Sequence, residues 1–153
     1  MVVIMNILIL SVGAKPKLET ANLMNDFVKR LPKHIHIEWR FLKHGNGSQD
    51  NSKQQEAEYI LRAIPVKSTV ILLDENGKQL SSPGLSKQVF EKGADVVFII
   101  GGAYGVADVV IKKADFVWSL GKLVYPHQLV RIIIAEQLYR AYSIFSGHPY
   151  HHG

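Results

Sequence analysis

The sequence predicts an α/β protein with a mainly parallel sheet and helices on both of its faces. Strand-like and helix-like segments alternate about five times along the chain. Three of the strand-like segments, at 5–12, 68–73 and 95–100, are almost continuously apolar, which is typical of strands that are buried on both faces. An alternation of this kind requires crossover connections, and these give parallel strands covered by helices.

The first third of the chain predicts two strands and one helix. A strand over 5–12 ends before Lys15-Pro16, and an amphipathic helix over 18–31 stops at Pro32. Apolar residues then alternate with polar ones from Ile35 to Phe41. This pattern predicts a half-exposed strand at the outer edge of the sheet.

The middle of the chain predicts a second helix and a third strand. The polar, glycine-containing segment 44–52 is expected to be a flexible loop. Ser52 and Gln55 have the spacing of a capping box for a helix over 53–64, which ends at Pro65. The strand at 68–73 is followed by an expected turn at 74–77, Asp-Glu-Asn-Gly.

The last part of the chain predicts three helices and two strands. A helix opens at Ser81-Ser82-Pro83, and Gly93 stands where a C-terminal capping glycine belongs. A strand at 95–100 leads into the glycine-rich segment 101–105, a short helix over about 106–113 and a fifth strand at 116–120. The loop 121–126 then opens the longest helix, at about 127–145.

The longest helix carries more apolar residues than one sheet face can cover. The apolar positions are Leu129, Val130, Ile132, Ile133, Ile134, Leu138, Tyr142 and Phe145. A helix buried on all sides would explain an arc this wide, and so would a helix that also packs against a second protomer. We favour the second interpretation, because a terminal helix of a small domain is rarely enclosed on every side.

Composition limits the class of protein. A chain of 153 residues suits a single domain spanning 1–153. The net charge is +5 with a sequence pI near 9.4, which is compatible with a polyanionic partner without establishing one. There are no cysteines, so disulfides and thiolate metal sites are excluded. The apolar start lacks the basic region of a signal peptide, so we expect a cytoplasmic protein whose start is Met1 or Met5.

The loops at 74–78, 101–105 and 121–126 all follow strands, and they should meet at one edge of the sheet. Gly101-Gly102-x-x-Gly105 lacks the spacing of a dinucleotide-binding loop, and the chain has no phosphate-binding P-loop. The three glycines therefore make either a tight turn alone or a backbone surface that a cofactor can approach closely.

Five motifs carry a family resemblance. They are Leu-Asp-x-x-Gly-Lys at 73–78, Ile-Gly-Gly-x-x-Gly at 100–105, Tyr-Pro-His-Gln-Leu-Val-Arg at 125–131, Ala-Glu-Gln-Leu-Tyr-Arg-Ala at 135–141 and His-Pro-Tyr-His at 148–151. In order and spacing the chain resembles the RlmH type of ribosomal RNA large-subunit methyltransferase, in the SPOUT superfamily. The resemblance implies an α/β fold with a C-terminal trefoil knot, a homodimer, S-adenosylmethionine as cofactor, and methylation of N3 of a pseudouridine in 23S ribosomal RNA.

The same resemblance implies a cofactor site. By position it falls on Leu73, Gly101 and the run Leu120, Gly121, Lys122, Leu123, Val124 and Tyr125. Apolar side chains and loop backbone of this kind can enclose a flat adenine ring and read its polar edge. The four-residue extension before Met5 and the pair Ala103-Tyr104 are the departures we note.

Methyl transfer to a ring nitrogen also requires alignment of the reactants and removal of a proton. The candidate catalytic residues are His148, Tyr150 and His151, in a tail that is expected to reach an active site, either its own or that of the partner subunit. His127 is a further candidate base. Each histidine has an ordinary alternative as a solvated or backbone-bonded residue, and no metal site is expected from the tail histidines.

Lys15, Lys17, Arg131 and Arg140 are candidate RNA-binding residues. The alternatives are solvated lysines and, for Arg140, a helical ion pair with Glu136. The expected partner is ribosomal RNA, in an assembled particle, with no membrane. Two other functions compete: a non-catalytic ribosome- or RNA-binding module of the same fold, and a small nucleotide- or flavin-binding protein.

Overall fold

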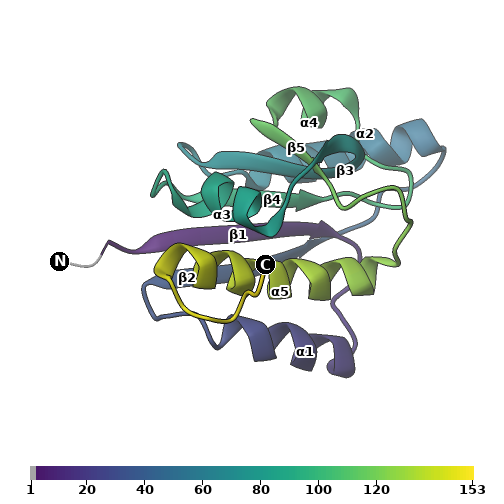
Figure 1. Cartoon of the computed structure of the whole chain (residues 1–153). Coiled ribbons are helices and arrows are strands. Elements are labelled where there is room, and N and C mark those ends of the chain that lie inside the picture. Colours follow the sequence, from purple (N-terminus) through teal and green to yellow (C-terminus); the bar gives the residue numbers. More distant parts are fainter. Residues whose placement is uncertain (1–2) are drawn as a thin grey trace.

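The computed structural model describes residues 3–153 and shows one five-stranded sheet in which every strand pair is parallel (Figure 1). The strand order is β2-β1-β4-β3-β5. The strands are β1 (Met5–Val12), β2 (Ile35–Leu42), β3 (Thr69–Gln79), β4 (Val96–Ile100) and β5 (Phe116–Ser119). The first two residues of the extension before Met5 lie outside the described part of the chain. The predicted α/β fold class is confirmed.

Five helices cover the two faces of this sheet. They are α1 (Leu18–Val28), α2 (Gln49–Ala63), α3 (Ser82–Phe90), α4 (Asp108–Lys113) and α5 (His127–Ser146). Helix α5 packs between α1 and α3 on one face, and α2 and α4 lie on the other (Figure 1). Alternate residues of β1 supply the two cores: Ile7 and Ile9 face the α5 side, whereas Leu8 and Leu10 face the α2 side.

Helix α2 begins earlier than the sequence predicted. Its N-cap is Ser48, whose Oγ accepts a hydrogen bond from the backbone N–H of Asn51 (3.2 Å), so residues 49–52 are helical rather than a loop. The predicted capping box is wrong: Ser52 is buried inside the helix, and Gln55 exchanges hydrogen bonds with the backbone of Asn46. A run with several good capping residues does not reveal from sequence which of them caps the helix.

Strand β3 continues through the segment that was predicted to be a turn. Its pairing with β5 shifts register between Leu73 and Lys78, so 74–77 is an irregularity within the strand and not a turn. A Cβ on Gly77 would lie 2.6 Å from the carbonyl oxygen of Val117. Glycine at this position therefore lets β5 approach, and Asp74–Asn76 protrude beside the sheet edge.

Helix α1 is shorter than predicted, whereas α5 agrees closely with its predicted bounds. Helix α1 ends at Val28, and residues 29–31 form turns before Pro32. Helix α5 begins after Pro126 and ends at Gly147, whose φ of +78° suits a glycine cap. Its own chain buries Ile134, Leu138 and Ala141, whereas Leu129 and Phe145 are exposed.

None of the helices within residues 3–153 is long and apolar enough to cross a membrane. The trefoil knot that the resemblance implies stays a prediction.

Candidate functional site

A cavity of about 570 Å³ opens at the carboxyl edge of the sheet. Its wall is built from the ends of β3, β4 and β5 together with the first turns of α5. These are the loops that the sequence predicted would converge. The volume lies within the range of small-molecule and cofactor sites.

Seven of the eight predicted cofactor residues line this cavity: Leu73, Gly101, Leu120, Gly121, Leu123, Val124 and Tyr125. Lys122 is exposed and is not part of the wall. Leu123 is 73% exposed and Val124 is 89% exposed, so the rim of the cavity presents apolar side chains to solvent. The exposed rim suits a surface that a ligand or a second protein covers.

Two glycines of the cavity are required by close approach, and a third is favoured by its backbone conformation. A Cβ on Gly101 would lie 2.6 Å from Cγ1 of Val106, and one on Gly102 would lie 2.7 Å from Oε1 of Glu56. Gly121 has φ +111°, a conformation that other residues rarely adopt. The glycine segment therefore makes a tight turn and also leaves bare backbone facing the cavity, so the two interpretations of this motif are compatible.

A buried serine holds the loop after β5. The Oγ of Ser119 accepts a hydrogen bond from the backbone N–H of Gly121 (3.0 Å), and the side chain is 3% exposed. Sequence analysis missed Ser119, because a lone serine at the end of a strand carries no distinguishing pattern.

The charged residues on the cavity wall are mostly acidic. Asp74, Glu75 and Asp108 line it, against one lysine, Lys53, and the imidazole of His127. The carboxylate of Asp74 is oriented by the backbone N–H of Asn76 (2.9 Å). The wall therefore suits a ligand with net positive charge.

Glu56 is a buried carboxylate that sequence analysis missed. Its Oε2 accepts hydrogen bonds from the backbone N–H of Gly45 (2.9 Å) and from Oγ of Ser52 (3.2 Å). Nδ1 of His44 lies 3.9 Å away, and the side chain is 7% exposed. Glu56 thus ties the loop after β2 to α2 beneath Gly102. The available signal was its place on the apolar face of α2, beside Ala57 and Ile60.

Arg131 is buried inside the protomer and not displayed at the surface. It is 1% exposed: its Nε donates to Oγ of Ser11 (2.9 Å), its Nη1 donates to the carbonyl of Ala14 (2.8 Å), and its guanidinium lies 4.6 Å from the ring centre of Phe41. Burial lowers its pKa. The side chain fastens α5 to the loop after β1, so we leave it out of the RNA-binding surface.

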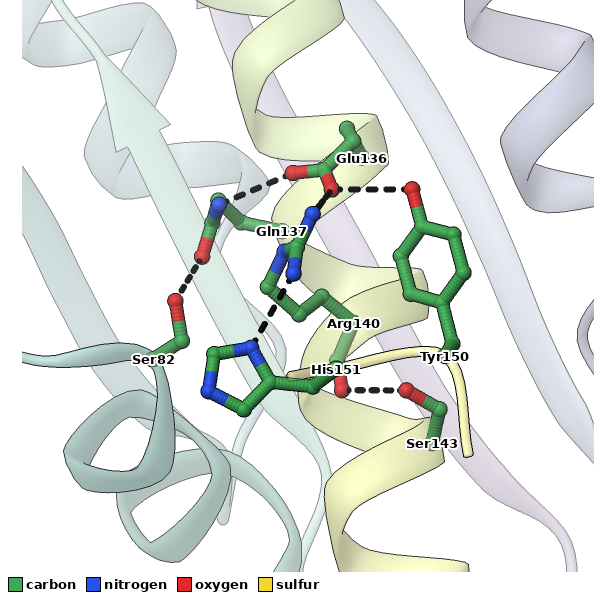
Figure 2. A network of polar contacts seen from close by, with 7 residues as sticks. All are labelled: Ser82, Glu136, Gln137, Arg140, Ser143, Tyr150 and His151. Carbon is green, nitrogen blue, oxygen red and sulfur yellow. Dashed lines mark hydrogen bonds and ion pairs between the residues drawn. The ribbon is translucent and has the colours of Figure 1, made fainter. Parts of the chain in front are cut away.

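The C-terminal tail folds back on α5 through a polar network (Figure 2). Oε1 of Glu136 accepts from Nε and Nη2 of Arg140 (2.8 and 2.6 Å) and from the hydroxyl of Tyr150 (3.1 Å). Nη1 of Arg140 lies 3.0 Å from Nδ1 of His151. Since a guanidinium only donates, Nδ1 accepts, and the proton of a neutral His151 is then on Nε2.

The same network shifts the pKa values of Tyr150 and Arg140. Burial raises the pKa of Tyr150, and the charge of Glu136 and its hydrogen bond raise it further. The hydrogen bond to Glu136 raises the pKa of Arg140. Tyr150 is therefore a neutral hydrogen-bond donor near pH 7. Arg140 forms the helical ion pair with Glu136 that was the alternative to RNA binding.

The predicted catalytic residues of the tail do not reach the cavity of their own protomer. His148, Tyr150 and His151 are absent from its wall, whereas His127 is present. His148 is exposed, and its backbone N–H donates to the carbonyl of Ser143 (2.8 Å). Lys15 and Lys17 are exposed beside β1 and α1. No group of side chains within residues 3–153 is arranged to hold a metal ion.

A parallel α/β sheet with a glycine-lined cavity at its carboxyl edge defines a cofactor- or nucleotide-binding class of protein. Comparison with known proteins narrows this class. The sequence model of the predicted SPOUT methyltransferases matches residues 5–151. The chain is 36% identical to the ribosomal RNA large subunit methyltransferase H of Christiangramia forsetii over 97% of its length and 99% of that protein.

A second relative with the same name, from Polynucleobacter asymbioticus, is 39% identical over 96% of this chain and 99% of that protein. A probable methylase family protein from Haemophilus influenzae has a similar fold, with a TM-score of 0.57, 9% identity, and coverage of 97% of this chain and 70% of that one. The chain belongs to the SPOUT methyltransferase family, within the group of ribosomal RNA large subunit methyltransferases H.

Proposed function

We propose that this protein transfers a methyl group from S-adenosylmethionine to N3 of a pseudouridine in 23S ribosomal RNA. The observation that carries the proposal is the glycine-lined cavity at the carboxyl edge, walled by seven of the eight residues that the resemblance assigns to the cofactor. The methyltransferase family to which the chain belongs, and the names of its relatives, supply the reaction and the RNA class.

The cavity fits S-adenosylmethionine in size, polarity and charge. Leu73, Leu120 and Leu123 would hold the adenine, and the bare backbone at Gly101 and Gly121 would lie against the cofactor. A sulfonium and an ammonium group suit the carboxylates of the wall, and Lys53 would balance the cofactor's own carboxylate. When bound, the cofactor supplies a methyl group on a positively charged sulfur.

The residues of the chain have two tasks in this reaction: to hold the target base in line with the methyl group, and to accept its N3 proton. Alignment within a closed site can supply a large part of the rate. His127 is the histidine on the cavity wall of the same protomer. His148, Tyr150 and His151 would act from the tail of a partner subunit, since they lie outside the cavity of their own protomer.

Exposed apolar surface at the start of α5 supports a homodimer. Leu123, Val124 and Leu129 expose apolar surface around the start of α5. An interface through the N-terminal part of α5 would cover this apolar rim.

Lys15 and Lys17 are the remaining candidates for contact with RNA, because Arg140 is held in its ion pair with Glu136. Lys15 and Lys17 are exposed and free of ion pairs with any residue of the described chain. A small dimer offers limited RNA-binding surface, so the proposed substrate is an assembled cytoplasmic particle in which RNA and protein together present the target.

The test is transfer of labelled methyl from S-adenosylmethionine to ribosomes that lack large-subunit modifications, compared with separate subunits and free RNA. Label at N3 of a pseudouridine in the 23S RNA of assembled particles is the expected result. RNA binding without cofactor binding would instead identify a non-catalytic module. Cofactor binding without label on any of the three substrates would show that the acceptor is different.

A further inference from the structure

A second groove lies at the open edge of the sheet, between β2 and α2. Its volume is about 480 Å³, and it is lined by three cations, Arg40, Lys43 and Arg62, and by two aromatic residues, Phe41 and Tyr59. It shares no residue with the wall of the cofactor cavity. Neither the methyl donor nor the tail network uses it.

The charge of this groove is positive and incompletely balanced. No carboxylate lines it. Arg40 is paired with Glu38 on the same strand (Nη2 to Oε2, 2.7 Å). Lys43 and Arg62 are exposed, and within residues 3–153 neither lies in an ion pair. Two unpaired cations therefore face the solvent across one groove, which is the arrangement that binds phosphate groups.

The two aromatic residues differ in whether their rings are free to contact a ligand. Phe41 stacks with Trp39 and carries the guanidinium of Arg131 over its ring, so its position is fixed by the protein. Tyr59 is half-buried, and its ring stacks on no other aromatic ring of the described chain. A half-buried ring between cations is a platform on which a nucleic-acid base can stack.

We propose that this groove binds a single-stranded segment of the RNA substrate, with its phosphates on Lys43 and Arg62 and one base stacked on Tyr59. The inference rests on the proposed function, which makes RNA the substrate. The chemistry favours RNA over an acidic peptide, since a peptide added to the open edge of β2 would be bound through backbone groups and would not require Tyr59.

The groove and the cofactor cavity are connected by α2. Lys53, near the start of this helix, lines the cavity, and Arg62, near its end, lines the groove. The two residues are nine positions apart along the helix, a rise of about 13 Å. An RNA strand bound along α2 would therefore pass from the groove toward the methyl donor.

The test combines a binding readout with a kinetic one. Lys43→Glu with Arg62→Glu reverses both unpaired cations, and Tyr59→Ala removes the platform. Lys87→Glu with Lys92→Glu, at α3 on the other face of the sheet, makes the same change in net charge as a control. Each dimeric protein is titrated with a single-stranded RNA and with a duplex over a range of salt, and KM and kcat are measured on ribosomes.

We expect reversal of the two groove cations to reduce the salt slope of single-strand binding by about 1.4, because each lost phosphate contact on a single strand reduces it by about 0.7. The KM for ribosomes should rise by about tenfold, while S-adenosylmethionine affinity and kcat stay within about twofold, because the groove lies apart from the cofactor. Tyr59→Ala should weaken single-strand binding by about tenfold and leave duplex binding unchanged. The control pair should leave all these values near wild type.

An unchanged salt slope, or a loss that the control pair reproduces, would overturn the inference. So would groove variants that lose their dimeric mass. Because RNA binding is measured without methyl transfer, a chain that binds RNA through this groove but transfers no methyl group would refute the proposed function and leave the groove assignment intact.

Discussion

Single residues beneath the cavity fix the shape of its floor. Glu56 receives hydrogen bonds from Gly45 and Ser52, and Ser119 holds Gly121. Neither side chain lines the cavity. Both act on backbone that lies beside or within it, and they are therefore positioning residues rather than catalytic ones.

Replacement of Glu56 by alanine should lower the free energy of unfolding by about 1–3 kcal/mol, because two donors lose a buried acceptor. Urea denaturation measures this loss. Glu58→Ala, two residues further along the same helix and exposed, should change stability by less than about 0.5 kcal/mol. Equal effects of the two changes would show that the hydrogen bonds of Glu56 contribute nothing.

The irregular part of β3 is the element that brings acidic residues to the cavity. Its register shift depends on Gly77, where a side chain would meet the backbone of β5. Because the obstacle is backbone, it cannot yield as a flexible side chain could.

Gly77→Ala should therefore destabilise the protein by about 2 kcal/mol through overpacking, and it should weaken S-adenosylmethionine binding because Asp74 and Glu75 move with the strand. Thermal unfolding and calorimetric titration of the cofactor test the two effects. Gly93→Ala is a useful comparison: Gly93, unlike Gly77, has positive φ (+65°), and no atom lies within 4 Å of its added Cβ, so this variant measures backbone strain without a clash. Wild-type cofactor affinity in the Gly77→Ala variant would show that the irregular part of β3 does not position the cofactor site.

The docked tail is the second element whose behaviour can be measured. The raised pKa of Tyr150 means that the folded protein favours the neutral phenol. The stability from this docking is fully present below the ordinary tyrosine pKa, near pH 10, and is lost as pH rises through the higher folded pKa. Ultraviolet titration should find one tyrosine that ionises above the others, and it should disappear in Tyr150→Phe. A titration curve unchanged by that substitution would contradict the docked geometry.

Sequence periodicity predicted the elements well where burial alone determines them. The apolar runs of β1 and β4 and the alternation of β2 lie where they were expected. The start of α2 and the path of β3 were mispredicted, because competing capping residues and the close approach of β5 are settled by tertiary contacts. The cavity residues could be anticipated from the family resemblance and from the convergence of loops at one edge of a parallel sheet. Glu56 and the burial of Arg131 could not, because tertiary contacts determine them.

At the scale of the whole molecule, the separation of the tail from its own cavity has a consequence for assembly. Of the residues proposed for catalysis, Tyr150 and His151 are held on α5 by Glu136 and Arg140, and His148 is held by the hydrogen bond of its backbone N–H to the carbonyl of Ser143. If they serve the partner's cavity, each active site needs one cofactor loop and one tail from different subunits. A symmetric dimer then contains two such sites.

Complementation between two inactive chains tests this arrangement. One chain carries Gly121→Trp in the cofactor loop, and the other ends after Ser146. In a mixed dimer, one site combines the intact loop of the truncated chain with the intact tail of the variant. Equal mixing of exchanging subunits should restore about a quarter of wild-type transfer, since half of the dimers are mixed and each has one working site.

A tail that acts within its own subunit gives the opposite result, because no mixed dimer would then hold a complete site. The mixture would stay inactive although each chain keeps its dimeric mass. Full activity of the truncated chain alone would remove the tail from catalysis altogether. The recovery of activity on mixing therefore distinguishes a site shared between subunits from one confined to a single chain, and it does so without requiring that any one tail residue be the base.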